Sequence, residues 1–132
     1  MSARNVELVR RIYDAWGREE SARDFIADDV EYVNPSYAVE PGTRQGRRSF
    51  AVVRETYGDF AVDPVQFIDA GEDDVVVLAR YQASGSGSGV PLSGEQGYVW
   101  TVRDGKAVRF RWFASHREAL EFAGLSADEA PD

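Results

Sequence analysis

The dipeptide Asp104-Gly105 constrains the fold more than any other feature of the sequence. Both residues tolerate the positive φ angles that a two-residue β-turn requires, and residues of high strand propensity flank them on both sides. We therefore predict a tight hairpin within the stretch Gly94–Leu120, with Arg103 opposite Lys106.

In a regular ladder, this turn fixes which side chains share a face of the hairpin. One face carries the pairs Thr101/Val108, Val99/Phe110, Gly97/Trp112 and Glu95/Ala114. This face is almost entirely apolar and is predicted to be buried, with Glu95 as its only acid. The other face carries Val102/Ala107, Trp100/Arg109, Tyr98/Arg111 and Gln96/Phe113. Aromatic residues mixed with arginines are typical of an interface, so we expect a homodimer through Tyr98, Trp100, Arg109 and Arg111.

Composition excludes several classes of site. The chain of 132 residues has no cysteine and one histidine, which rules out disulfides and thiolate metal sites and argues against a histidine-based zinc site. We expect neither a metal nor an organic cofactor. The net charge of −8 disfavours nucleic acid and anionic membranes as partners. Without an apolar run long enough to span a bilayer, or a signal peptide, a cytoplasmic protein is expected.

Hydrophobic spacing and turn residues divide the rest of the chain. They predict helices over Ser2–Arg18, Ser21–Ile26 and Arg47–Phe60, strands over Val30–Asn34, Pro64–Asp69 and Val75–Gln82, and a short last helix from Ser115 through Phe122. Ser36–Gly46 and Ser84–Gly89 are predicted loops. This order indicates an α+β fold in which a curved, mostly antiparallel sheet wraps around the N-terminal helices as a cone with an internal pocket. We expect residues 1–125 to form one domain and residues 126–132 to form a solvated tail.

Six segments together resemble the SnoaL-like branch of the nuclear-transport-factor-2-like superfamily. They are NVELVRRIYDAW, ADDVEYVNP, GTRQGRRSF, SGSGVP, VWTVRDGKAVRFRWF and REAL, in that order. The resemblance implies a cone with a pocket, often dimeric. It also implies a chemistry that varies among ketosteroid isomerases, polyketide cyclases, epoxide hydrolases and dehydratases.

The sequence departs from the catalytic residues of these relatives. The isomerases have an aspartate that acts as the general base at the position of Asn34, just before Pro35. An amide cannot accept a proton at neutral pH, so Asn34 cannot take this role. Tyr32-Val33-Asn34 keeps the Tyr-x-Asn element with which the epoxide hydrolases position a water. Their Arg-x-Asp appears here as Arg80-Tyr81-Gln82, and their second aspartate falls at or near Trp112. Both carboxylates of that pair are therefore missing.

Arg80 and Glu95 are the only charged residues expected on the pocket side. They either form a structural pair at the rim, or Glu95 acts as a general acid or base beside Arg80. Tyr32, Asn34 and Gln82 are candidates for ligand contact, although Asn34 could instead only cap the turn before Pro35. Four aromatic residues are further candidates for ligand contact: Tyr13 and Tyr57, as core residues whose hydroxyls reach the rim, and Trp16 and Trp112, as pocket wall or core.

Two functions remain open at this point. One is a module that binds a small, largely apolar molecule. The other is an isomerase, cyclase or epoxide-hydrolase-like enzyme that uses Glu95. Retention of Tyr32, Asn34 and Arg80 favours the enzyme, and the loss of the family's acids favours the binding module.

Overall fold

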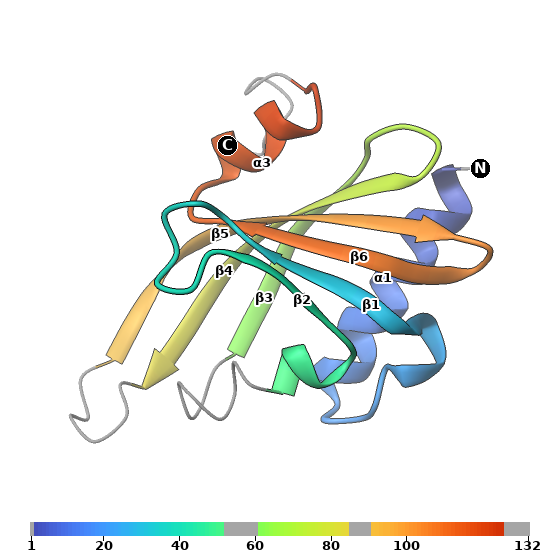
Figure 1. The fold of residues 1–132 in the computed structure, drawn as a ribbon, viewed down its shortest axis with the longest axis horizontal. Helices are drawn as coiled ribbons and strands as arrows, with labels where there is room; N and C mark the ends of the chain where they lie inside the picture. Colours follow the sequence, from blue (N-terminus) through green and yellow to red (C-terminus); the bar gives the residue numbers. More distant parts are fainter. Residues whose placement is uncertain (1, 52–60, 85–90, 126–132) are drawn as a thin grey trace.

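The computed structural model describes residues 2–51, 61–84 and 91–125. Their helical elements are α1 (Ser2–Gly17), the short 3₁₀ helix η1 (Arg23–Phe25) and α3 (His116–Phe122), and residues 48–51 are helical as well. The strands are β1 (Ile26–Asn34), β2 (Gly42–Gln45), β3 (Ala61–Asp69), β4 (Asp74–Ser84), β5 (Pro91–Arg103) and β6 (Lys106–Phe113) (Figure 1).

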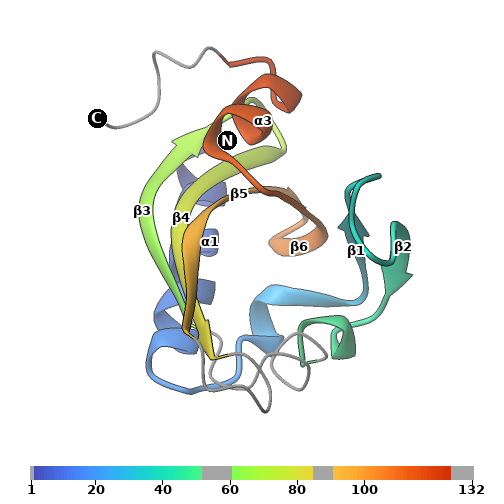
Figure 2. The same ribbon diagram turned by 90° about the vertical axis from the view of Figure 1, so that its left-hand side faces the viewer.

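The six strands form one sheet in the order β2-β1-β6-β5-β4-β3. Every neighbouring pair is antiparallel except β1 and β6, which run parallel. The sheet curls so strongly that β3 and β2 stand on opposite sides of its interior (Figure 2). The predicted α+β fold with a curved, mostly antiparallel sheet is therefore confirmed.

Three local predictions need correction. The predicted loop Ser36–Gly46 contains strand β2, and the predicted strand Val30–Asn34 is longer than expected, because β1 begins at Ile26. The expected helix at Ser21–Ile26 is a single 3₁₀ turn, at whose start the Ser21 hydroxyl accepts from the Arg23 amide at 3.2 Å. Most of the predicted helix Arg47–Phe60, and residues 85–89 of the loop Ser84–Gly89, lie outside the described residues.

The hairpin turn has the predicted geometry, but the strands that follow it do not keep a regular register. Asp104 and Gly105 have φ angles of 53° and 75°, and Arg103 pairs with Lys106. Val102 then pairs with Ala107, whereas Thr101 pairs with Arg109, so Val108 is an extra residue in β6. Relative to β5, this bulge moves every later side chain of β6 to the face opposite from the one that a regular ladder predicts.

The bulge brings the aromatic residues of the hairpin together. Trp100 lies opposite Phe110 and Tyr98 opposite Trp112. These residues face α1, on the concave side of the sheet that we call the inner face, together with Val75 and other core residues. Tyr98 and Trp100, which were predicted on the interface face, are thus buried on the inner face, and Val99 is buried on the opposite face.

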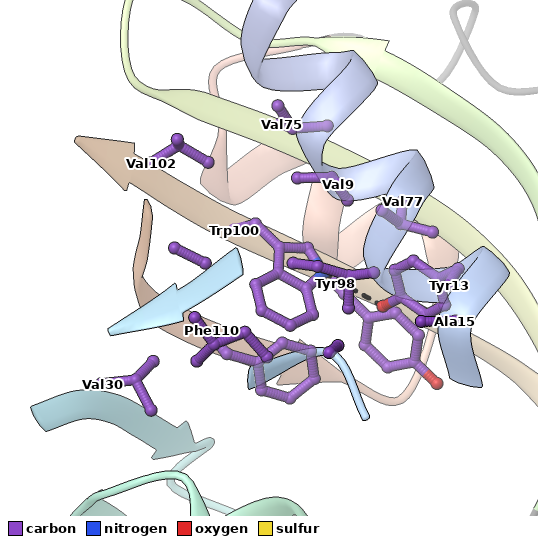
Figure 3. Packing of buried hydrophobic residues seen from close by; sticks show 14 of the residues in the cluster. Val9, Tyr13, Ala15, Val30, Val75, Val77, Tyr98, Trp100, Val102 and Phe110 are labelled. Atoms are coloured by element: carbon purple, nitrogen blue, oxygen red, sulfur yellow. Dashed lines mark hydrogen bonds between the residues drawn. The ribbon is translucent and has the colours of Figure 1, made fainter. Parts of the chain in front are cut away.

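Aromatic rings fill the space between α1 and the inner face (Figure 3). Trp100 is fully buried, with ring centroids 4.7 Å from Phe110, 5.7 Å from Phe50 and 6.0 Å from Tyr13. Rings this close prefer edge-to-face or offset contacts and contribute beyond their buried area. This cluster holds β5, β6 and α1 in fixed positions.

Helix α3 packs on the opposite, outer face of the sheet. Its Ala119 and Leu120 bury Val76, Leu78 and Val99, all five being almost inaccessible to solvent. The Ser115 hydroxyl accepts from the Glu118 amide and caps the helix, and Gly124, at a φ of 80°, follows its end.

Gly97 sets how closely α3 approaches the sheet. A Cβ atom at this position would lie 2.5 Å from the Ala119 Cβ and 3.0 Å from the Ser115 carbonyl oxygen. Gly97 does not have a positive φ, so the backbone conformation does not require a glycine here. The lack of space for a side chain does.

Candidate functional site

A group of uncharged polar side chains lies on the inner face, which we call the inner polar cluster. Its members come from α1, β1, β5 and β6: Tyr13, Asn34, Gln96, Tyr98, Trp100 and Trp112. Tyr13 and Tyr98 are nearly buried, and their rings stack with centroids 6.3 Å apart (Figure 3). Asn34, Gln96 and Trp112 are each partly exposed.

Three hydrogen bonds connect these side chains in pairs. The Trp100 Nε1–H donates to the Tyr13 hydroxyl oxygen at 3.0 Å, and the Trp112 Nε1–H donates to Asn34 Oδ1 at 2.6 Å. The Tyr98 hydroxyl donates to Gln96 Oε1 at 2.6 Å. No carboxylate or guanidinium among the described residues hydrogen-bonds to any of the six.

The two buried phenols stay protonated at neutral pH. Burial raises the pKa of Tyr13 well above its usual value, and the nearby Tyr98 hydroxyl raises it further. Burial likewise raises the pKa of Tyr98, with smaller contributions from the Tyr32 and Tyr81 hydroxyls. The cluster is therefore a set of neutral hydrogen-bonding groups rather than an acid or base.

We expect stability to fall as the pH rises above about 10, the usual tyrosine pKa. Below that pH both phenols are protonated in both states. Above it the unfolded chain loses these protons while the folded state retains them, which favours unfolding by about 1.4 kcal/mol per pH unit for each tyrosine. Urea denaturation between pH 9 and 11.5 measures the free energy of unfolding. It should decline less steeply with pH in Tyr98→Phe than in the wild-type chain. A decline in Tyr98→Phe as steep as that of the wild-type chain would contradict this assignment.

Arg80 and Glu95 are not where the sequence predicted them. They are direct partners across β4 and β5, but on the outer face, beyond Leu78 and Gly97. In the part of the chain that the structure describes, Arg80 and Glu95 form no ion pair with each other. Glu95 is 43% exposed, and it accepts from the His116 amide at 2.8 Å beside α3. The expected placement on the pocket side was wrong, and an exposed carboxylate that binds a helix terminus gives no reason to expect acid–base catalysis.

The remaining predicted site residues divide into two groups. Gln82 lies on the outer face with Arg80 and is exposed. Tyr32 faces inward, with its ring 5.0 Å from Phe110, and Trp16 packs in the core at 5.4 Å from Tyr13. Tyr57 lies outside the described residues.

The residues predicted for the dimer interface do not share one face. Tyr98 and Trp100 are buried on the inner face, so that part of the prediction was wrong. Arg109 and Arg111 are on the outer face, where Arg109 donates to Glu31 at 2.8 Å and Arg111 lies 4.7 Å above the Phe122 ring. Burial lowers the pKa of Arg111, and the neighbouring Arg109 lowers it further. A homodimer stays a prediction.

Sequence reasoning missed Gln96 and Tyr98 as inner-face residues. One signal could have found them. Tyr98 and Trp100 share one face of β5, and Phe110 and Trp112 share one face of β6. Only one extra residue in the hairpin brings these four rings to the same side.

The chain belongs to the SnoaL-like domain family, which matches residues 9–110. No curated protein matches it. The solved structure of TerC, co-crystallised with polyporic acid, is 25% identical, with a TM-score of 0.70 over 92% of this chain and 98% of that one.

Two further solved structures share the fold. A nuclear-transport-factor-2-like protein of unknown function from Burkholderia pseudomallei is 24% identical, with a TM-score of 0.71 over 96% of this chain and 99% of that one. A ketosteroid-isomerase-like protein from Catenulispora acidiphila, in complex with trimethylamine, is 21% identical, with a TM-score of 0.66 over 95% and 98% of the two chains. No described helix is long and apolar enough to span a membrane.

Proposed function

We propose that this protein binds a small, flat, uncharged and largely apolar molecule on the inner face of its sheet. One observation carries the proposal: the inner polar cluster offers phenol, amide and indole groups among aromatic rings, with no charged partner among the described residues. Small-molecule sites are typically apolar surfaces with a few placed polar groups. The similarity to TerC, which was crystallised with polyporic acid, supports a small-molecule ligand.

The positions and protonation of the candidate acid–base groups favour ligand binding over catalysis. The carboxylate that the sequence offered as acid or base, Glu95, is on the outer face. The phenols of Tyr13 and Tyr98 have raised pKa values and hold their protons at neutral pH. The described cluster can therefore orient a ligand without exchanging protons with it.

The test compares two substitutions at neighbouring positions: one adds a carboxylate to the inner face, and the other removes a carboxylate from the outer face. Titration with 9-fluorenone, followed by the indole N–H signals of Trp100 and Trp112, should show saturable binding. Gln96→Glu places a carboxylate on the inner face and should weaken binding at least about tenfold, or about 1.4 kcal/mol, because a charge must be desolvated beside an apolar ligand. Glu95→Gln makes the reverse exchange on the outer face and should change affinity less than about twofold.

Two results would contradict the proposal. One is the absence of saturable binding by any uncharged tricyclic compound. The other is a larger loss for Glu95→Gln than for Gln96→Glu, which would move the binding site to the outer face.

A further inference from the structure

The inner face becomes accessible to solvent at one end of three strands. Side-chain exposure rises from the first to the second residue in each of three pairs: Trp100 and Gln96 in β5, Phe110 and Trp112 in β6, and Tyr32 and Asn34 in β1. The register places the three more exposed residues at the same end of the sheet. We call this the open end, because it is where a small molecule can reach the inner polar cluster.

The segment between β1 and β2, residues 35–41, lies at the open end, and we call it the strap. It follows Asn34 directly, and its Tyr37 ring packs edge-on against Trp112, with the ring centroids 6.4 Å apart. The Tyr37 hydroxyl accepts from the Ala114 amide at 2.8 Å and donates to Glu118 Oε2 at 3.1 Å. Tyr37 thus fastens the strap both to the connection that follows β6 and to α3.

These two hydrogen bonds are the main attachment of the strap. Among the described residues, no other side chain of the strap hydrogen-bonds beyond the β1–β2 hairpin. Tyr37 is 52% exposed, so packing adds little to the two bonds. Its acceptor Glu118 is held in place by the helix cap, since the Ser115 hydroxyl donates to the same Oε2 at 3.1 Å. A hydrogen bond to a carboxylate is also stronger than one between neutral groups.

We propose that the strap is a gate at the open end and that the Tyr37 hydroxyl is its latch, so that a ligand enters and leaves when the latch opens. This rests on the proposed function and adds the residue that controls ligand exchange. Opening breaks the bonds to Ala114 and Glu118 and moves the phenol ring away from Trp112. The latch holds the free and the ligand-bound protein alike, so it sets the rates of binding and release rather than the affinity.

Tyr37→Phe tests the latch, because it keeps a ring against Trp112 and removes both hydrogen bonds. Stopped-flow mixing with 9-fluorenone, followed by tryptophan fluorescence, gives the association and dissociation rate constants. Each should rise at least about tenfold, and the dissociation constant should change less than about twofold. A merely structural role would weaken binding without raising both rates. Thermal unfolding verifies that the variant is folded.

Two further positions serve as controls. Val39→Ser changes a strap side chain that is 99% exposed and should alter neither rate. Glu118→Gln keeps an oxygen for the Tyr37 hydroxyl but removes the charge, so it should raise both rates less than Tyr37→Phe does. Added to Tyr37→Phe, it should have no further effect, because the hydroxyl that it acts through is gone.

Hydrogen exchange of the Trp112 indole N–H tests the gate without a ligand. This N–H donates to Asn34 beside the Tyr37 ring, and Tyr37→Phe should raise its exchange rate at least about tenfold. The Trp100 indole N–H, which is buried and donates to Tyr13, is the internal reference and should keep its wild-type rate.

The outcomes distinguish this inference from the function on which it rests. If fluorenone binds and Tyr37→Phe leaves both rate constants within about twofold of the wild type, the gate is wrong and the binding function stands. If no uncharged tricyclic compound binds, the proposed function fails, and the Trp112 exchange rate alone decides on the gate: a faster rate in Tyr37→Phe supports it, and an unchanged rate overturns it.

Discussion

Gly97→Ala should lower the free energy of unfolding by about 3 kcal/mol, the upper end of the usual cost of overpacking. The added methyl would lie 2.5 Å from the Ala119 Cβ and 3.0 Å from the backbone oxygen of Ser115. Neither atom is the end of a flexible side chain, so α3 must move away from the sheet. Urea denaturation gives the loss, and hydrogen exchange should show faster exchange of the α3 amides.

A second glycine of the same strand provides the control. The three atoms nearest to a methyl at Gly94 all belong to the Tyr81 side chain, the closest at 3.1 Å, and a ring can rotate away. Gly94→Ala should therefore cost less than about 1 kcal/mol. Adding Ala119→Gly to Gly97→Ala should recover part of the loss, since it removes the nearest contact. Wild-type exchange in α3 of the Gly97→Ala protein would contradict the close packing described above.

Trp100→Ala should cost about 3–5 kcal/mol, the range for truncating a large buried aromatic side chain. Trp100 is fully buried, and its indole N–H bonds the Tyr13 hydroxyl. The truncation leaves a cavity between β5 and α1 and removes the donor to Tyr13. Chemical denaturation monitored by circular dichroism measures the difference.

Trp100→Phe is the matched variant. It retains a ring against Phe110 and Phe50 but removes the indole N–H, so its cost should be clearly smaller than that of the alanine variant. Equal costs for the two variants would mean that ring packing at this position contributes little. A cost below about 2 kcal/mol for Trp100→Ala would contradict its central place in the core.

Local chemistry predicted much of the fold. The φ requirements of Asp104-Gly105 identified the hairpin, and the Ser115 cap identified α3. The register beyond Val102 could not be predicted from the turn alone, because it depends on which side chains of β6 become buried. A regular ladder would place Arg109 and Arg111 beside Trp100 and Tyr98 in the interior. Burying two guanidinium groups costs several kcal/mol each, whereas a bulge leaves one residue of the ladder unpaired.

The same error decided which of the predicted site residues lie on the inner face. Asn34, Tyr13 and Trp112 lie on the inner face, where hydrogen bonds connect each to a neighbour. Glu95 was placed there because the unbulged hairpin turned its face inward. Arg80 was placed there by family resemblance, and the pairing of Arg80 with Glu95 carried both to the outer face together. A rule that separates aromatic from charged residues would have predicted the observed arrangement.

The parallel pairing of β1 with β6 has a consequence for how the chain folds during synthesis. β1 ends at Asn34, but its central partner is complete only at Phe113. On a ribosome, apolar side chains of α1 and β1, such as Val9 and Val30, thus emerge long before β6, the strand that completes their burial. Contacts so distant in sequence favour slow folding, since the loop must close before the pairing stabilises it. The nascent chain therefore exposes its N-terminal apolar surface until β6 has been translated.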